Sequence, residues 1–419
     1  MDVVVIGGGY AGVAAAVQAA QMGARVRLLE RTETLLGTGQ VGGIFGNNGR
    51  CTLELECRAM GATALWERLD TVRLHDGLDI PDNRHTVLID VSAAVCKAEG
   101  WLKELGVQVF YRTRAVRVKQ QQGHLMSVFD DVGRAFEADA FVDASGSAGP
   151  MSVCVREGNG CVMCAMRCPS YGGRVSVSTL AGGREHTAQW RMSGSCKLVP
   201  ESLSPALRRQ LQKRGAVQLP LSDPLDKQIL HGKACGQYAG QAFAQNLILL
   251  DTGFVKLMAP FVPLDRLRQV SGLERAVYAD PYAGGHGNSV RLTAWIERDN
   301  TLQVPPSDNL FCAGERAGRT VGHTEAIVSG TLAGYNAVRA CRRQPLLILP
   351  ETLACGALIA HTERWPQKVL TAAGGDFFAW MKQQGLYTTD AAQAAERVRN
   401  AGLYGVFAQA SCFSDEQGV

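Results

Sequence analysis

The sequence lacks long hydrophobic runs, an excess of one charge, fixed-period repeats and tracts of low complexity. Its longest apolar stretches are broken by glycine or charge, short of the roughly 18 apolar residues of a membrane helix. We therefore expect no membrane span. The chain has 43 Lys and Arg residues against 39 Asp and Glu residues, a formal net charge of +4, without a basic tail. This balance neither requires nor excludes a nucleic-acid partner.

We also expect no secretory leader at the start of the chain. Residues 1–9 already read as a hydrophobic strand that runs into a glycine turn, where a leader would have a basic start and a cleavage site. We expect a soluble, cytoplasmic protein. Its 13 cysteines are odd in number, and a chain of 419 residues without a leader is not expected to carry a disulfide framework.

The clearest motif lies at the N terminus. Residues 2–31, DVVVIGGGYAGVAAAVQAAQMGARVRLLER, read as a strand, a glycine turn, an alanine-rich helix and a second strand. Gly7, Gly9 and Gly12 form G-x-G-x-x-G at the turn. The first glycine permits a tight turn, the second lets the backbone approach a pyrophosphate, and the third lets the helix pack closely. The motif predicts a dinucleotide site at the helix N terminus.

Further segments favour FAD over NAD as the dinucleotide. Glu30 ends the second strand, where its carboxylate can accept the hydroxyls of an adenosine ribose, and Arg31 follows it. A glycine-containing strand end at 142–146, VDASG, and a strand–glycine–acid unit at 310–315, LFCAGE, resemble parts of FAD-binding folds. Three separated segments that converge on one ligand predict FAD. The contact residues expected in the last two are Ala144, Gly146, Gly314 and Glu315.

A glycine-rich segment and a late helix start are expected near the flavin. Residues 37–49, GTGQVGGIFGNNG, contain too much glycine for an ordinary helix or strand. They predict a loop whose N–H groups, at Gly43 for example, approach a flat ligand, with a surface loop as the alternative. Gly322 and His323 stand where the last cofactor-binding helix should begin. His323 is a candidate proton donor or base there, with a packing role as the alternative.

Other candidate catalytic residues are scattered along the chain. Glu325 follows His323 closely, and His286 lies in the glycine-flanked segment YAGGHGNSVR. Cys51 and Cys57 flank the sequence TLELE near the predicted flavin loop. Either thiol could act as a nucleophile if its pKa is lowered, and a small buried residue is the alternative for each.

A cysteine cluster, Cys161-Val-Met-Cys164-Ala-Met-Arg-Cys168-Pro169, has the spacing C-x2-C-x3-C-P. The last two spacings of a bacterial ferredoxin run match it. Three interpretations stay open: an iron–sulfur cluster, a zinc or thiol redox site, and unligated reduced thiols. A cluster needs a fourth ligand, for which the candidates are Cys154, Cys196 and Cys235.

Changes in residue pattern divide the chain into four parts. We assign 1–146 to the first part of an FAD-binding domain, including a helix over 92–105 and strands within 107–120. An inserted, cysteine-containing substrate lobe follows over 147–305. The FAD-binding domain returns over 306–345, and a helical C-terminal region covers 346–419. The predicted fold is α/β, an FAD-binding Rossmann-like fold of the glutathione-reductase type.

Three segments resemble a known superfamily: GGGYAG, FCAGERAGRTVGHTEAIVSGTLAGYNA and LPETLACGALIAH. Its members are the folate- and FAD-dependent tRNA uracil methyltransferases and the tRNA uridine modifiers of the glucose-inhibited division protein A type. The segment VSGLERAVYADPYAGGHGN is similar to a further stretch of these proteins. The chain also resembles clostridial-type FAD-dependent oxidoreductases with a similar C-x2-C-x3-C-P segment. The resemblance implies the fold and FAD, while the surroundings of Cys51 differ from the reactive-cysteine motif of the methyltransferases.

The function expected from these features is an FAD-dependent oxidoreductase. Flavin N5 would exchange hydride with a small substrate or an electron-transfer partner, with NAD(P)H as a candidate donor and an iron–sulfur or thiol site in the inserted lobe. One alternative is a tRNA uridine-modifying flavoprotein that uses folate, and another is a non-enzymatic flavin redox sensor. The near-neutral charge disfavours tRNA as partner, because RNA binding usually needs a concentrated basic surface. Four residues could form such a surface: Arg208, Arg209, Lys213 and Arg214.

Overall fold

The computed structural model describes ten stretches of the chain: residues 1–81, 83–146, 175–192, 195–225, 238, 240–259, 262–279, 290–364, 370–372 and 375–408.

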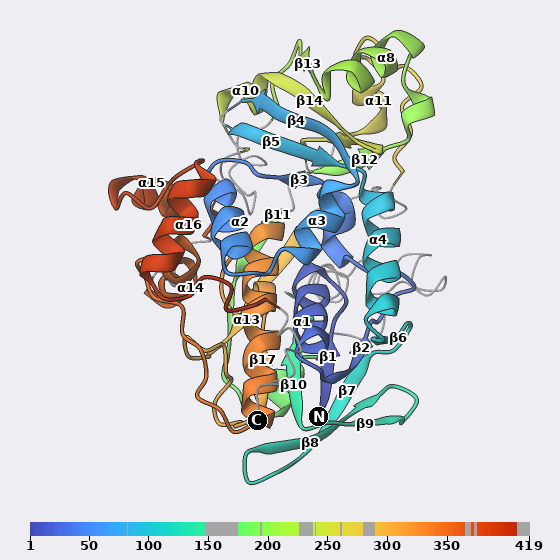
Figure 1. Ribbon diagram of the computed structural model, residues 1–419. Helices are drawn as coiled ribbons and strands as arrows, with labels where there is room; N and C mark the ends of the chain where they lie inside the picture. The colour runs from blue at the N-terminus through green and yellow to red at the C-terminus, as the bar shows by residue number, and fades with distance from the viewer. Residues whose placement is uncertain are drawn as a thin grey trace.

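A five-stranded parallel sheet forms the centre of the fold (Figure 1). Its order is β17 (Leu310–Cys312), β10 (Ala140–Asp143), β1 (Asp2–Ile6), β2 (Arg25–Leu29) and β6 (Gln108–Phe110). Every neighbouring pair is parallel. The valines of β1 are fully buried, as expected of a parallel strand covered on both faces. The parallel order brings the carboxyl ends of segments far apart in sequence to one edge, and the predicted Rossmann-like fold is confirmed.

Two helices lie side by side next to this sheet, α1 (Tyr10–Gln21) and α13 (His323–Cys341) (Figure 1). Their close approach depends on glycine. A Cβ added to Gly330 would lie 2.2 Å from the carbonyl oxygen of Ala11, and Gly334 has the same relation to the next turn of α1. Glycines four residues apart lie on one face of a helix, so α13 presents a groove in which the backbone of α1 packs.

An antiparallel meander and a helix complete this domain. The meander consists of β7 (Ala115–Gln121), β8 (His124–Asp130) and β9 (Ala135–Glu137). The helix α4 (Val91–Glu104) begins after Asp90, whose carboxylate accepts hydrogen bonds from two N–H groups of its first turn. The helix and strands predicted over 92–120 are therefore confirmed.

A second lobe is built on a four-stranded antiparallel sheet, shown at the top of Figure 1. Its order is β12 (Cys196–Leu198), β15 (Phe254–Leu257), β14 (Asn246–Thr252) and β13 (Ala216–Pro220). One face packs against α8 (Pro205–Arg214) through a leucine-rich core.

The other face of the four-stranded sheet packs against an earlier part of the chain. There β3 (Ile44–Phe45), β5 (Asn83–Ile89) and β4 (Arg73–Ile80) form a small antiparallel sheet. Its Ile80 shares an apolar core with Leu250 of β14. The second lobe is thus completed by strands that precede position 146 in the sequence.

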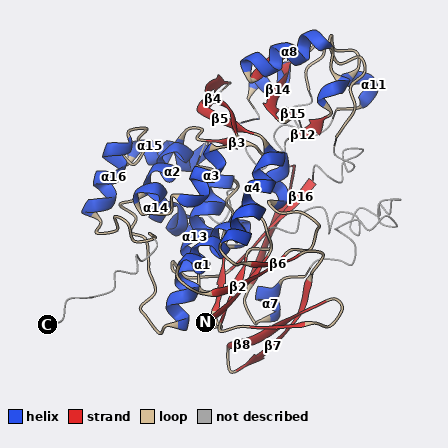
Figure 2. Cartoon of the chain, turned by 45° about the vertical axis from the view of Figure 1, so that its right-hand side comes forward, coloured by secondary structure: helices blue, strands red, loops and turns tan. Residues whose placement is uncertain are grey.

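A fourth antiparallel sheet is the pair of β11 (Glu185–Met192) and β16 (Val290–Ile296), of which β16 is labelled in Figure 2. The shorter elements are η1 (Gly37–Val41), α3 (Ala64–Asp70), α7 (Val177–Leu180), η2 (Pro200–Ser202), α10 (Gln241–Gln245), α11 (Leu264–Leu267) and η4 (Gly314–Arg316).

The C-terminal part of the chain is helical in its described residues, as predicted. Its helices are α14 (Ala354–Arg364), α15 (Gly375–Gln383) and α16 (Ala391–Asn400), which gather around α2 (Gly49–Ala59) (Figure 1). The buried Glu56 carboxylate of α2 links them. It accepts hydrogen bonds from the first two N–H groups of α14 and pairs with a guanidinium of α16 at 3.2 Å.

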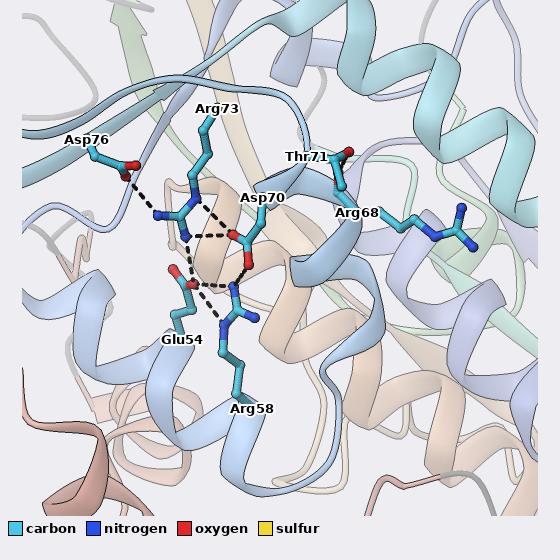
Figure 3. Close-up of polar contacts among 7 residues, drawn as sticks. All are labelled: Glu54, Arg58, Arg68, Asp70, Thr71, Arg73 and Asp76. Atoms are coloured by element: carbon cyan, nitrogen blue, oxygen red, sulfur yellow. Dashed lines mark hydrogen bonds and ion pairs between the residues drawn. The ribbon is translucent and has the colours of Figure 1, made fainter.

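A network of ion pairs connects α2 to α3 and β4 (Figure 3). Arg58 binds Glu54 at 2.8 Å and Asp70 at 2.7 Å, while Arg73 binds Asp70 and Asp76. Burial raises the pKa of Glu54, although Arg58 opposes the shift. Because several of these groups are partly exposed, we assign the network a role in orienting the elements more than in adding stability.

Candidate cofactor and active site

The glycine turn between β1 and α1 has the predicted geometry. Gly7 has φ +100°, and a Cβ on it would lie 2.5 Å from the carbonyl oxygen of Ala144. A Cβ on Gly12 would lie 1.8 Å from the Gly7 carbonyl oxygen, whereas a Cβ on Gly9 would meet nothing within 4 Å. Packing therefore requires the first and third glycines, and open space adjoins the second, where the backbone can approach a ligand.

Glu30 lies beside this turn. Its side chain is buried, and one carboxylate oxygen accepts a hydrogen bond of 2.8 Å from the backbone N–H of Gly8. The other oxygen accepts from the N–H and hydroxyl of Thr32 at 2.8 and 2.9 Å. Arg31, the next residue, is half-buried. The acid thus stands at the end of β2 in the position expected for ribose recognition.

The glycine-rich segment after β2 folds back over the turn. The N–H of Leu36 donates to the carbonyl of Gly8 at 2.7 Å, and Gly37 approaches Gly9. The expectation that 37–49 contains no helix or strand is wrong in part. It includes the 3-10 helix η1 and the strand β3, because Ile44 and Phe45 satisfy their backbone groups against β5.

Three helix N termini around this segment have no side-chain cap. They belong to α1, α2 and α13, which begin after Gly9, Asn48 and Gly322. Of the other helices, α4, α8 and α16 are capped by Asp90, Ser204 and Asp390, whereas the short helices α3, α10 and α11 also have no side-chain cap. Uncapped N–H groups and the positive end of a helix dipole favour a negatively charged ligand. The arrangement is that of a site for an anionic cofactor.

Two buried hydroxyl groups near these helix starts also point to a polar ligand. The Tyr10 hydroxyl and the Thr324 hydroxyl make no hydrogen bond to any described residue, and their side chains are 4% and 0% exposed. Tyr10 opens α1, and Thr324 lies in the first turn of α13. Because buried polar groups are normally hydrogen-bonded, both are placed to receive partners from a bound cofactor. The residues present fit FAD.

His323 packs in an aromatic cluster at the start of α13. Its ring centroid lies 4.9 Å from that of Tyr10 and 5.4 Å from that of Phe45. A Cβ on Gly42 would lie 1.7 Å from the His323 Nε2 atom, so the imidazole touches the glycine-rich segment. Gly43, the next residue, has φ +79° and lies against Thr252 of the second lobe.

Glu325 holds structural elements together. Its carboxylate is 1% exposed and binds the Arg50 guanidinium at 3.0 and 3.1 Å and the backbone N–H of Ala372 at 3.0 Å. Arg50 also donates to the Val321 carbonyl at 2.7 Å. These contacts join α2, α13 and a C-terminal segment, and they suit a positioning role better than the proton transfer expected from the sequence.

The two cysteines near this site have raised pKa values. Burial, with a contribution from Glu54, raises the pKa of Cys51 to about 11. Burial raises the pKa of Cys57 to about 12. A thiol of this kind is protonated at neutral pH and is a weak nucleophile. The lowered pKa on which the nucleophile hypothesis depended is therefore contradicted for both.

A buried ion pair at the carboxyl end of β10 was not predicted from the sequence. The Arg316 Nε atom lies 3.6 Å from Asp143, which also accepts hydrogen bonds from the hydroxyls of Ser145 and Ser178 at 2.6 Å. Burial alone would raise the pKa of Asp143, but Arg316 and these hydroxyls hold it below its ordinary value. Arg316 reaches Glu185 as well, at 2.7 Å. The only sequence signals were an acid within VDASG and an arginine within GERAGR.

The neighbouring predicted contacts lie along the same edge. Ala144 closes on the glycine turn, and Gly146 has φ +72° with open space around it. Gly314 has φ +64°, and its N–H donates to the Ser329 hydroxyl at 2.9 Å. Glu315 is half-buried in η4. The structure therefore brings the three predicted FAD segments together.

The predicted metal ligands are mostly beyond the described part of the chain. Cys161, Cys164, Cys168 and Cys235 lie outside the described residues, as does His286. Cys196 is buried in β12, and its thiol donates to the Ala259 carbonyl at 3.3 Å. No group of three or more His, Cys, Asp or Glu side chains within the described ranges could hold a metal ion. The metal-site hypothesis stays a prediction.

None of the helices in the described stretches combines sufficient length with sufficient apolar character to cross a bilayer.

Two family models match separate parts of the chain. The model of FAD dependent oxidoreductases matches residues 2–154, and the model of glucose inhibited division protein A matches residues 250–345. A solved structure of Aquifex aeolicus GidA covers 96% of this chain with a TM-score of 0.66 at 15% identity, and 73% of that chain is covered. At this identity the likeness shows the fold.

Curated relatives match over shorter stretches. The methylenetetrahydrofolate–tRNA-(uracil-5-)-methyltransferase TrmFO of Desulfitobacterium hafniense is 37% identical over 100 residues, which are 24% of this chain and 22% of the relative. The tRNA uridine 5-carboxymethylaminomethyl modification enzyme MnmG of Nitratiruptor sp. is 34% identical over 97 residues, 23% of this chain and 15% of the relative. The chain thus matches less than a quarter of the length of these two relatives. In these matched segments the chain is similar to FAD-dependent oxidoreductases and to the GidA and TrmFO proteins, and it shares the fold of GidA.

Proposed function

We propose that this chain is an enzyme, an FAD-dependent oxidoreductase that acts on a small substrate. The observation that carries the proposal is that three uncapped helix N termini lie around the glycine-rich segment 37–49. This segment folds back over the glycine turn, where Gly9 adjoins open space and the Glu30 carboxylate lies alongside. A dinucleotide with a negatively charged pyrophosphate and an adenosine ribose satisfies both features.

Different residues would bind the different parts of the cofactor. The turn at Gly9 and the N terminus of α1 would bind the pyrophosphate, and Glu30 would bind the ribose. The buried hydroxyls of Tyr10 and Thr324 would bind the flavin part. FAD, when bound, supplies two-electron chemistry by accepting a hydride equivalent at flavin N5 and carrying the resulting negative charge on its ring.

His323 is the protein group best placed to exchange a proton during this chemistry. Its imidazole opens α13 and lies against Tyr10, beside the region assigned to the flavin. The aromatic rings of Tyr10 and Phe45 surround it and would limit the access of water. Glu325 and Arg50 would hold the start of α13 in place without touching the substrate.

Cofactor analysis tests this proposal. Denatured, freshly purified protein should release FAD, identified by chromatography and mass, in about one equivalent per chain. Absence of FAD both from the purified protein and after incubation with excess FAD would refute the proposal.

A second redox group and the electron donor are finer parts of the proposal. The spacing of Cys161, Cys164 and Cys168 is consistent with an iron–sulfur cluster, a zinc site or a thiol redox site. NAD(P)H is the candidate electron donor. An anaerobic absorption spectrum with iron, zinc and acid-labile sulfide assays distinguishes the three. Bleaching of the flavin band by NADH or NADPH tests the donor. We propose the cytoplasm as the location, and fractionation of cells tests that.

A second candidate function is modification of a uridine in tRNA. Two observations favour it: the names of the relatives, and the basic residues of α8, of which Arg209, Lys213 and Arg214 are exposed. If α8 binds RNA phosphates, the affinity for tRNA should fall steeply with salt, and the double variant Arg209→Glu/Lys213→Glu should abolish binding. Folate-dependent methyl transfer to tRNA would place this candidate first.

A further inference from the structure

Lys256 is a buried lysine in the second lobe. It lies in β15 with 5% of its surface exposed. Its neighbours in the strand, Val255 and Leu257, belong to the core beneath α8. Because side chains alternate along a strand, Lys256 lies on the opposite face, where its register partner Leu250 packs against the small sheet of β3, β4 and β5.

The ammonium group of Lys256 reaches the other domain. Its Nζ atom donates a hydrogen bond of 2.9 Å to the backbone carbonyl of Gly42. A Cβ on Gly42 would lie 1.7 Å from the imidazole of His323, the first residue of α13. The second lobe therefore delivers a positive charge to the glycine-rich segment, next to the helix start assigned to the flavin.

An ammonium group in this position has an energetic cost. Removing a charge from water costs several kcal/mol even after relaxation, and an apolar side chain of similar volume is often as stable or more stable in its place. On its face of the sheet Ile248, Leu250 and Met258 are apolar, and its register partner in β12 is a second lysine, Lys197. Its hydrogen bond to Gly42, beside the start of α13, points to an electrostatic task.

We propose that Lys256 is a positioning residue that raises the reduction potential of the flavin. A cation close to the ring stabilises the negative charge that the ring carries after it accepts hydride, and the positive end of the α13 dipole acts in the same direction. The lysine also makes this stabilisation depend on docking of the second lobe, because β15 supplies the charge and α13 belongs to the FAD-binding domain. This inference rests on the proposed FAD function.

The test uses the FAD-loaded full chain and separates charge from hydrogen bonding. Lys256→Gln keeps a donor for the Gly42 carbonyl but removes the charge, and Lys256→Arg keeps the charge. Lys197→Met is the matched control, because Lys197 pairs with Lys256 across β12 and β15 and its ammonium lies 4.7 Å from the ring centroid of Phe254. The measurements are FAD content, the midpoint potential, and the affinity for sulfite, whose sulfur bonds to flavin N5 and leaves the ring negatively charged.

We expect Lys256→Gln to bind FAD normally and to bind sulfite at least tenfold more weakly. Its reduced flavin should be destabilised about tenfold relative to the oxidised form, which is ~30 mV for a two-electron couple. Lys256→Arg should recover most of both effects, and Lys197→Met should match the wild type.

Wild-type values for Lys256→Gln, or an equal shift in Lys197→Met, would overturn the role of Lys256 and leave the proposed function intact. Equal loss of FAD from the Gln and Arg variants would also overturn it, by showing a purely structural contact. A wild-type chain that holds no FAD would refute both proposals together.

Discussion

Asp143 and Arg316 form a buried ion pair at the carboxyl edge of the parallel sheet, with 3.6 Å between the Asp143 Oδ2 and Arg316 Nε atoms. The pair connects the ends of β10 and β17, two strands that come from distant parts of the chain. Arg316 continues to Glu185 of β11, and Asp143 to Ser178 of α7. One charge pair thus fixes four segments at the edge where the cofactor is proposed to bind.

Asp143→Asn should destabilise the protein by about 3 kcal/mol, because it leaves a buried guanidinium with less compensating charge. Urea unfolding at pH 7 measures the change. Asp139→Asn is the control, since the Asp139 side chain is 59% exposed and its loss should cost less than about 1 kcal/mol. Equal effects of the two substitutions would contradict the importance of the buried pair.

The same pair predicts part of the acid sensitivity of the fold. The pKa of Asp143 is lower in the folded state than its ordinary value of 3.8, so the unfolded chain binds the proton more tightly. The stabilisation is complete above pH 3.8 and is lost as the pH falls from there toward the folded pKa. The free energy of unfolding of Asp143→Asn should depend less on pH in this window than that of the wild type. Parallel pH profiles would contradict the assignment.

Gly9 and Gly12 should respond differently to alanine. A Cβ on Gly9 meets no atom within 4 Å, so Gly9→Ala should change stability by no more than about 1 kcal/mol while it weakens FAD binding about tenfold or more. Gly12→Ala forces a Cβ to 1.8 Å from the Gly7 carbonyl oxygen and should impair both folding and FAD binding. Thermal unfolding of the FAD-free protein and FAD titration separate the effects. Unchanged FAD affinity in Gly9→Ala would argue against cofactor contact there.

The groove between α1 and α13 predicts a large cost for a small side chain. Gly334→Ala would place a Cβ 2.3 Å from the Ala15 carbonyl oxygen, and overpacking of this kind costs about 1–3 kcal/mol. Gly100→Ala in α4 is the matched control, because open space surrounds Gly100. It should stabilise its helix by about 0.5–1 kcal/mol. Chemical denaturation of both variants tests whether the two substitutions change the free energy of unfolding in opposite directions.

Cys51 should be a slow nucleophile at neutral pH. Burial and Glu54 raise its pKa to about 11, so the thiolate is scarce at pH 7 and increases tenfold per pH unit up to that value. Iodoacetamide labelling of native protein, followed by peptide mass spectrometry, should show Cys51 reacting far more slowly than the exposed Cys96. Rapid labelling at pH 7 would restore Cys51 as a candidate nucleophile.

Local patterns in the sequence were sufficient for the elements that carry the dinucleotide site. The strand before Gly7, the helix after Gly9 and the acid at Glu30 follow each other within 2–31, and the steric needs of a tight turn leave little freedom in that order. The late helix starting at His323 was predictable for the same reason. Glycine-rich residues 37–49 were less predictable, since the short strand β3 depends on pairing with β5.

Tertiary structure decided which distant side chains meet. Asp143 pairs with Arg316 because the folded chain buries both side chains at the same edge of the sheet. The raised pKa of Cys51 likewise follows from its surroundings in the folded chain. Lys256 and Gly42 are 214 positions apart, and no local pattern links them. Propensity and periodicity act over a few residues, whereas buried charge and close packing depend on the path of the whole chain. The sequence by itself therefore determined the dinucleotide motif, and only the folded topology decided which charges surround it.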